Sequence, residues 1–182
     1  MKKITLFLLL VISLQVSAQI RRVALFDFTK PTELNPSITP RTDNGGGLKV
    51  SDKVFTNGLA NISFVDGSQI TGAQIQTGID EEWNITSYTL RLTYTTQMVF
   101  SCTNGATIDS IRISHDSVIG DLSLNNSDQP GTLDALQGCE LWKSEPNSNV
   151  SKVEIKNGPN STEFKQIAVY YKENASTLSA SF

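Results

Sequence analysis

The sequence has few of the side chains from which catalytic and metal sites are usually built. It contains one histidine, His115, and two cysteines, Cys102 and Cys139, in 182 residues. One histidine and two distant cysteines do not complete a zinc ligand shell. A Ser–His–Asp arrangement would have to use His115, but its neighbours Ser114 and Asp116 would point to the opposite face of a strand. His115 is therefore interpreted as a half-buried or edge residue of a strand.

Basic clusters and long apolar runs are also scarce. The chain has 15 Lys and Arg against 18 Asp and Glu, a formal net charge of −3, and its one basic pair outside the N-terminus is Arg21-Arg22. A nucleic-acid-binding domain presents a basic face, so nucleic acid is not an expected partner. The longest apolar run lies within the first 18 residues and is shorter than the roughly 20 residues that span a membrane. We therefore expect no membrane span.

The N-terminus MKKITLFLLLVISLQVSA has the organisation of a cleavable secretory signal. Lys2 and Lys3 precede the apolar segment, and Val16-Ser17-Ala18 provides small residues at the cleavage positions. We expect export to the periplasm, the cell surface or the medium, and the lack of a cysteine at the cleavage point argues against a lipid anchor. The expected organisation is a signal peptide at 1–18, one domain at 19–172 and a flexible tail at 173–182.

The body of the chain consists of short stretches with alternating apolar residues, separated by turn signals. The clearest stretch is 88–96, YTLRLTYTT, and the strongest hairpin signal is Asn104-Gly105. At most one helical turn is expected, around Leu133–Leu136. The pattern predicts an all-β fold, a single antiparallel β-sandwich of jelly-roll type with about ten to twelve short strands.

Two stretches share an uneven apolar spacing. Ile108-x-x-Ile111-x-Ile113 is repeated as Phe164-x-x-Ile167-x-Val169. An extra residue between two inward positions is what a β-bulge produces, because the bulge lets both apolar residues face the core. We therefore predict one β-bulge in each stretch, in equivalent places of two sheets.

Cys102 and Cys139 both lie in the part expected to be exported. Two cysteines in an oxidising compartment most simply form one disulfide, which is the prediction here. Two separate buried thiols are the alternative.

With these residues, the chain resembles small secreted β-sandwich proteins of Gram-negative gut anaerobes. The motifs that carry the resemblance are FDFTKPTELNPS (26–37), VFTNG (54–58), IDSIRI (108–113), Trp142 and IAVYY (167–171). The resemblance implies a sandwich with a role at the surface or in the periplasm, and it transfers no catalytic residue to this chain. In such bacteria an Asp-Ser/Thr-apolar tripeptide can mark O-glycosylation, which makes Ser110 and Ser117 candidates.

Carboxylates and tryptophans are the remaining candidate site residues. Paired carboxylates could hydrolyse a glycoside, and the pairs on offer lie in Asp80-Glu81-Glu82 or are formed by Glu140 and Glu154. Glycan binding needs only exposed rings with polar neighbours, for which Trp83, Glu82 beside it, and Trp142 are candidates. Trp142 also fits a core position.

A cofactor is not expected, but a structural calcium ion is left open. Asp43, Asp66 and Asp128 stand in loops that could hold one, although no EF-hand pattern is present. The function predicted from the sequence is an exported, non-catalytic glycan- or surface-binding accessory protein whose partner is a glycan or another cell-surface component. The alternatives are a structural or protein–protein interaction module of the cell envelope and, less favoured, a small glycosidase. The sequence does not indicate an oligomeric state.

Overall fold

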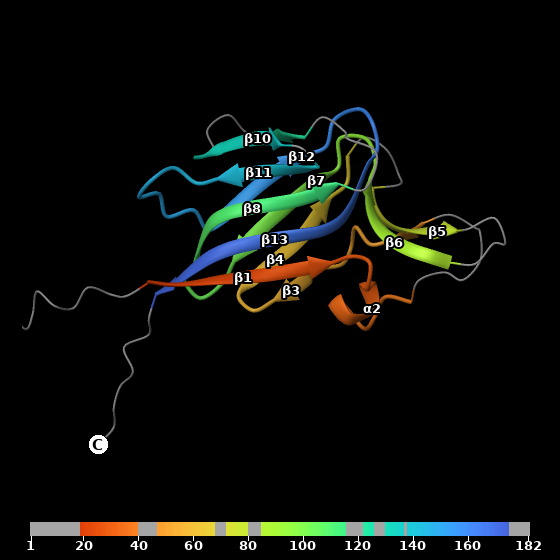
Figure 1. Ribbon diagram of the computed structural model, residues 1–182, viewed down its shortest axis with the longest axis horizontal. Coiled ribbons are helices and arrows are strands. Elements are labelled where there is room, and N and C mark those ends of the chain that lie inside the picture. Colours follow the sequence, from red (N-terminus) through yellow and green to blue (C-terminus); the bar gives the residue numbers. More distant parts are fainter. Residues whose placement is uncertain are drawn as a thin grey trace, which may run out of the picture.

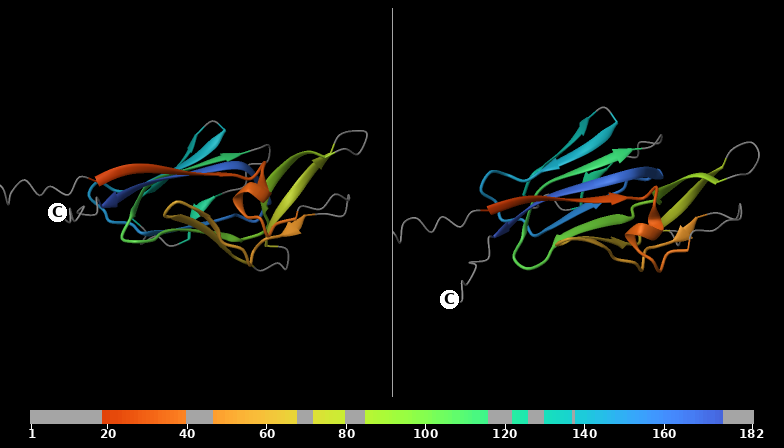
Figure 2. Two further views of the ribbon diagram at one scale, coloured as in Figure 1. Left: turned by 90° about the horizontal axis from the view of Figure 1, so that it is seen from below. Right: turned by 60° about the horizontal axis from the view of Figure 1, so that its bottom comes forward.

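The computed structural model describes residues 19–39, 47–67, 72–79, 85–115, 122–125, 130–136 and 138–174. Within them the chain forms two antiparallel sheets that lie over one another as two layers (Figures 1 and 2). This confirms the predicted all-β sandwich. The described part holds one short helix, α2 (Pro31–Leu34), and thirteen strands: β1 (Gln19–Asp27), β2 (Leu48–Lys49), β3 (Phe55–Asn57), β4 (Ala60–Val65), β5 (Ala73–Ile79), β6 (Ile85–Leu92), β7 (Gln97–Cys102), β8 (Thr107–His115), β9 (Ser123–Leu124), β10 (Thr132–Leu136), β11 (Cys139–Lys143), β12 (Lys152–Lys156) and β13 (Thr162–Asn174).

The larger sheet is organised around β13. Its strand order is β10-β11-β8-β13-β6-β5-β2, and β1 pairs with β13 in addition, which makes eight strands. β13 pairs with β8 along one edge, and with β6 and then β1 along the other. The smaller sheet has five strands in the order β3-β4-β7-β12-β9. β13 ends at Asn174, two residues after the domain limit of 172 that the sequence predicts, and the domain boundaries themselves stay a prediction.

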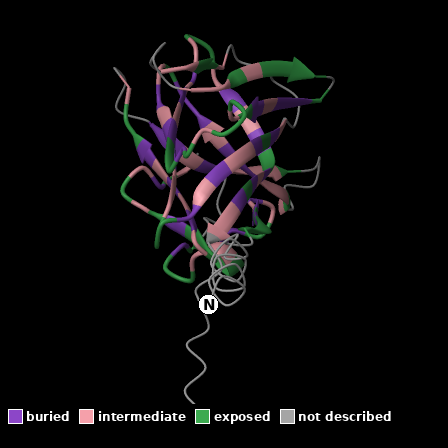
Figure 3. Ribbon diagram, turned by 90° about the vertical axis from the view of Figure 1, so that its left-hand side faces the viewer, coloured by how far each residue is buried: buried purple, intermediate pink, exposed green. Residues whose placement is uncertain are grey.

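The core lies between the two sheets and follows the period-two alternation of the strands, which Figure 3 shows as bands of buried residues between intermediate or exposed ones. On β4, for example, Ala60, Ile62 and Phe64 are buried, as their spacing predicts. Phe55 of β3 contacts Phe28 and Phe64 edge-to-face, with ring centroids 5.3 and 5.9 Å apart. Such edge-to-face pairs add to the stabilisation from burial. They tie the segment after β1 to the smaller sheet.

Both predicted β-bulges are present. The register of β8 against β13 shifts between Tyr170 and Tyr171, which leaves Asp109 as the extra residue on β8. A second shift lies between Phe164 and Gln166 on β13. The bulges lie on neighbouring strands of one sheet, so the expectation of equivalent places in two sheets was wrong.

The Asn104-Gly105 signal does form a tight turn, but the turn does not close a hairpin. Both residues have positive φ, 54° and 72°, and the Ala106 N–H donates to Thr103 O across the turn. The strands on either side, β7 and β8, belong to different sheets. The turn therefore carries the chain from one layer of the sandwich to the other.

Two local expectations also need correction. The stretch 88–96 is not one strand, because β6 ends at Leu92 and the chain then reverses at Tyr94 and Thr95, whose φ values are 22° and 51°. Residues 132–136 form the strand β10 and not a helical turn, because they pair along their whole length with β11. The single helical turn, α2, begins with Pro31, whose fixed φ and missing N–H suit the first turn of a helix.

The predicted disulfide between Cys102 and Cys139 is absent, and both thiols are free. Cys102 ends β7, next to the turn that leads to Thr107 at the start of β8, whereas Cys139 pairs with Ser114 near the far end of β8. The run of β8 between Thr107 and Ser114 is about 23 Å long at the usual rise of a strand. A disulfide requires Cα atoms within about 7 Å, so strand β8 holds the two cysteines too far apart.

A buried polar network joins two of the connections between the sheets. The side chain of Asn157, which is fully buried, accepts a hydrogen bond from Thr162 Oγ1 at 2.6 Å and donates one to Asn160 O at 2.6 Å. The Asn157 backbone N–H donates to Thr96 O at 2.9 Å. Because Asn157 lies between β12 and β13 and Thr96 lies between β6 and β7, these bonds hold the two connections together.

Replacement of Asn157 by alanine is expected to destabilise the fold, because the partners of its amide would stay buried without hydrogen bonds. We expect Asn157→Ala to lower the free energy of unfolding by about 3 kcal/mol, measured by urea unfolding. Asn149→Ala, at an exposed asparagine, serves as the control and should change it by less than about 0.5 kcal/mol. Equal effects of the two substitutions would contradict the role assigned to Asn157.

The state of the cysteines can be tested by thiol titration. Burial raises the pKa of the Cys102 thiol to about 11, so at pH 8 this thiol should react slowly with a disulfide reagent in the native protein. In denaturant without reductant, two thiols per chain should titrate, and one in a Cys102→Ser variant. A denatured, unreduced protein with no titratable thiol would show that the disulfide forms after all.

Candidate binding groove

The outer face of the larger sheet carries large apolar side chains that the core does not use. On β1, Val23 and Leu25 are 56% and 46% exposed, and on β13 Tyr170 is 40% exposed. The register pairs Val23 with Tyr170 and Leu25 with Ala168, so the four side chains form one block across two strands. On the other side of β13, Ala168 pairs with the exposed Arg112 of β8. This face therefore combines one aromatic ring with apolar and cationic neighbours.

Three adjoining depressions follow this face, and we refer to them together as the outer groove. Their volumes are about 210, 360 and 270 Å³. The first shares Arg21, Asp109 and Ser110 with the second, and Tyr170 with the third. The groove crosses β1, β13 and β8 and reaches the turn after β11. It is lined by Arg21, Arg22, Leu25, Asp109, Ser110, Arg112, Ser114, Lys143, Ser144, Glu145, Pro146, Asn147, Gln166, Ala168, Tyr170, Tyr171 and Lys172.

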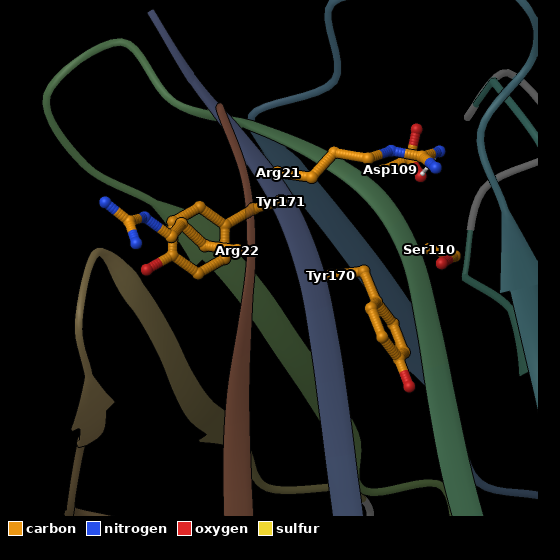
Figure 4. Close-up of a pocket in the computed structure, with 6 residues that line it drawn as sticks. All are labelled: Arg21, Arg22, Asp109, Ser110, Tyr170 and Tyr171. Atoms are coloured by element: carbon orange, nitrogen blue, oxygen red, sulfur yellow. Dashed lines mark hydrogen bonds and ion pairs between the residues drawn. The ribbon is translucent and has the colours of Figure 1, made fainter. Parts of the chain in front are cut away.

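The first β-bulge places Asp109 at the centre of an ion-pair cluster in this groove. Arg21 Nη2 lies 2.5 Å from Asp109 Oδ2, and Lys172 Nζ lies 2.7 Å from Asp109 Oδ1. Figure 4 shows the Arg21 side chain extending from β1 across β13 toward Asp109 on β8. Partial burial alone would raise the pKa of Asp109, but the hydrogen bonds and charges of Lys172 and Arg21 outweigh it and lower this pKa. Asp109 is therefore held ionised at neutral pH. The three side chains are called the Asp109 cluster below.

Tyr171 anchors the same end of the groove to the smaller sheet. Its ring is buried, and its hydroxyl oxygen accepts a hydrogen bond from the Leu59 N–H at 3.4 Å. Gly58 approaches so closely that a Cβ there would lie 2.5 Å from the Tyr171 hydroxyl oxygen, and its φ of +60° also favours glycine. Beside Tyr171, the Arg22 Nε lies 3.6 Å from a Glu173 carboxylate oxygen. The groove end is thereby supported by the β3–β4 turn.

Trp142, a predicted ligand residue, lies in the core. Its side chain is completely buried, because Trp142 pairs with Ile111 and shares its inward direction. Gly131 packs so closely against the ring that a Cβ atom at this position would lie only 2.8 Å from two of the ring carbons. A ring in this position cannot stack on a sugar, so the interpretation of Trp142 as a core residue holds and its assignment to a ligand site was wrong.

The other predicted ligand and modification residues fall in different places. Trp83, Glu82 and Ser117 lie outside the described residues, as does the signal segment 1–18. Ser110 lines the outer groove opposite Tyr170, and its O-glycosylation stays a prediction. His115 is the last residue of β8, where it pairs with Phe164, as expected for the end of a strand.

The carboxylate pair Glu140 and Glu154 is not brought together, because the two residues belong to different sheets. Glu140 of β11 faces the interior with an exposure of 6%, and burial raises the pKa of its carboxyl group. Glu154 of β12 bonds to Lys152 at 2.6 Å and to the Asn125 amide at 2.9 Å, and these bonds lower its pKa. The prediction that Glu140 and Glu154 form a carboxylate pair was therefore wrong. The cluster Asp80-Glu81-Glu82 lies outside the described residues.

The described loops do not assemble a cation site. No group of three or more His, Cys, Asp or Glu side chains that could hold a metal ion occurs in the described part of the chain. Asp66, one of the three loop carboxylates considered for calcium, instead pairs with Lys49 at 2.7 Å. Asp43 and Asp128 belong to segments outside the description.

Tyr170 and Arg112 are the groove residues that sequence reasoning missed. Two consecutive tyrosines on one strand point to opposite faces, so the pair Tyr170-Tyr171 was a signal that one ring faces outward. Arg112, between the buried Ile111 and Ile113, is outward by the same rule. The sequence could place both residues on a strand, but it could not show that their strands are neighbours.

Comparisons with known proteins found no match for this chain. No protein-family model matches the chain, and no curated protein or solved structure matches it significantly. Within the described residues, no helix is long and apolar enough to cross a membrane.

The Asp109 cluster predicts a pH-dependent contribution to stability. Because the pKa of Asp109 in the folded protein is below its ordinary value of 3.8, the contribution is present above that pH and is lost as the pH falls through the lowered pKa. We expect Asp109→Asn to lower the free energy of unfolding at pH 7 by about 1 kcal/mol. In denaturant titrations, this difference from the wild type should disappear in strong acid.

Glu145→Gln provides the matched control, because the exposed Glu145 side chain also lines the groove but forms no ion pair with the described residues. It should change the free energy of unfolding at pH 7 by less than about 0.5 kcal/mol. If Asp109→Asn lowers the free energy of unfolding by the same amount at acid and at neutral pH, the cluster does not stabilise the protein through its charges.

Proposed function

We propose that the protein is an exported, non-catalytic accessory protein, with a sandwich of jelly-roll type, that binds a glycan in the outer groove. The observation that carries this proposal is the position of Tyr170. Tyr170 is 40% exposed and lies on the outer face, with Ser110 and Arg112 on the neighbouring strand β8 and Gln166 on its own strand. The apolar face of a sugar ring stacks on an aromatic side chain, while hydroxyl, amide and guanidinium groups bond to the sugar hydroxyls. The groove offers all three kinds of polar group.

The position of Tyr170 within the sheet supports the same function. Tyr170 pairs with Val23 of β1 on one side and with Ser110 of β8 on the other, so its backbone is fixed on both edges. A binding site on hydrogen-bonded strands is ordered before the ligand arrives, which reduces the entropy lost on binding. The groove crosses three neighbouring strands, which suits a chain of sugars that runs across them.

The carboxylates of the groove support binding over hydrolysis. A glycosidase needs a carboxylic acid that is protonated at the working pH, beside a second carboxylate. Asp109 has a lowered pKa because two cations hold it. Glu145, the other carboxylate that lines the groove, is exposed to solvent.

A second function is favoured by one observation. Val23 and Leu25 expose aliphatic side chains on β1. An aliphatic surface of this kind suits a protein partner as well as a sugar. In that case the domain would serve as an interaction module of the cell envelope. The two functions differ in the residue that matters most, Tyr170 for a glycan and the Val23–Leu25 pair for a protein.

A glycan array with matched tyrosine variants tests the proposal. Tyr170→Ala should weaken binding by about ten-fold or more, because it removes the stacking surface, and Tyr170→Phe should retain most of it. Tyr94→Ala is the control, since Tyr94 is 45% exposed and does not line the outer groove. Circular dichroism of each variant checks that it is folded.

Two further variants extend the test, one on the glycan array and one in an assay of binding to envelope proteins. Trp83→Ala tests the ligand role predicted for Trp83 from the sequence. If the wild type binds no glycan above background, glycan binding is refuted. If, in addition, the wild type captures an envelope protein and the Val23→Ser, Leu25→Ser double variant does not, the result favours the interaction module.

A further inference from the structure

The outer groove is positively charged although the protein as a whole is acidic. Five of its lining side chains are cationic, Arg21, Arg22, Arg112, Lys143 and Lys172, whereas two, Asp109 and Glu145, are anionic. The whole chain has a formal net charge of −3. Cations concentrated in a groove of an otherwise acidic protein attract ligands of negative charge.

Three of the five cations already have partners within the protein. Arg21 and Lys172 bond to Asp109, and Arg22 lies near Glu173. The Asp109 cluster joins two cations to one carboxylate, so it retains a positive charge and does not repel an anion. Asp109 therefore does not cancel the attraction of the groove.

Arg112 and Lys143 are the two groove cations that have no such partner among the described residues. Both are exposed, and neither has an ion pair or side-chain hydrogen bond to another described residue. An unpaired, solvated cation in a groove can exchange water for a carboxylate or sulfate group. Such charge-assisted bonds are roughly twice as strong as neutral ones, and the guanidinium group of Arg112 can form two at once.

The register places these two cations around the aromatic ring. Ser110 pairs with Tyr170 on one side and with Lys143 on the other, and Arg112 follows two residues along the same face of β8. Residues two apart on a strand are separated by about 7 Å. A sugar ring stacked on Tyr170 would therefore have a cation within reach on β8 and a second one on β11.

From this arrangement we propose that the ligand of the outer groove is an anionic glycan, a chain of uronic acid or sulfated sugars. Its acidic groups bind Arg112 and Lys143, and one of its rings stacks on Tyr170. This inference rests on the proposed function, because it names the class of glycan that the same groove takes.

Pairs of polysaccharides that share a backbone and differ in charge provide the test. We would compare polygalacturonate with its methyl-esterified form, and chondroitin sulfate with its desulfated, carboxyl-reduced form, by affinity electrophoresis and calorimetry. The charged member of at least one pair should bind about ten-fold more tightly than the neutral member. Its affinity should fall as NaCl concentration rises, because salt screens exposed charges.

Variants assign the effect to the groove. Arg112→Gln and Lys143→Gln should each weaken binding of the charged polysaccharide about ten-fold and weaken binding of the neutral one by a smaller factor, because glutamine can still form hydrogen bonds with sugar hydroxyls. Tyr170→Ala should weaken binding of both. Lys156→Gln is the matched control, because it removes the same charge from β12 of the smaller sheet and should have no effect.

The possible failures are distinguishable. Equal affinity for charged and neutral members would overturn the anionic class and leave glycan binding standing, whereas no binding to any polysaccharide would overturn both. If Lys156→Gln weakens binding of the charged polysaccharide as much as Arg112→Gln and Lys143→Gln do, the attraction depends on the overall charge of the protein. That result would overturn the role of Arg112 and Lys143. Binding to vesicles of anionic phospholipid that is as tight, and equally sensitive to Arg112→Gln, would replace the glycan with a membrane surface.

Discussion

The ladder that β13 forms with β8 on one edge and with β1 on the other is the interaction on which the rest of the structure depends. It places the inward residues of three strands in one layer of the core and their outward residues in one groove. Because side chains alternate along a strand, a shift of one residue in this register would exchange core and groove. The same hydrogen bonds therefore determine both the stability of the sandwich and the composition of its candidate binding face.

The β-bulge at Asp109 is what makes the groove different from an ordinary sheet surface. The extra residue lets Ile108 and Ile111 both face the core, and it directs the carboxylate of Asp109 toward Arg21 and Lys172. An unbulged strand would have to turn one of these isoleucines outward. The irregularity thus provides the groove with an ionised carboxylate whose charge is already compensated.

Local patterns predicted the strands well and their partners poorly. The alternation in β4 and the spacing of Ile108 and Ile111 depend on side chains a few residues apart, so the sequence alone identified the strand and the bulge. The turn at Asn104-Gly105 has the same local chemistry whether its strands pair or separate into two sheets. The direction of Trp142, the distance between the cysteines and the meeting of Tyr170 with Arg112 all depend on which strands become neighbours, which is decided by packing across the whole domain.

The antiparallel pairing of β1 with β13 brings Gln19 next to Asn174, at the end of the ladder beside Arg21 and Lys172. Tension applied between these two residues would open the ladder as a zip, one hydrogen bond after another, and not in shear against all of them at once. The first pairs to separate would be those that hold the Asp109 cluster and Val23 beside Tyr170. A domain tethered at both of these residues would lose the groove under a small force, whereas a domain tethered at a single residue would keep it intact.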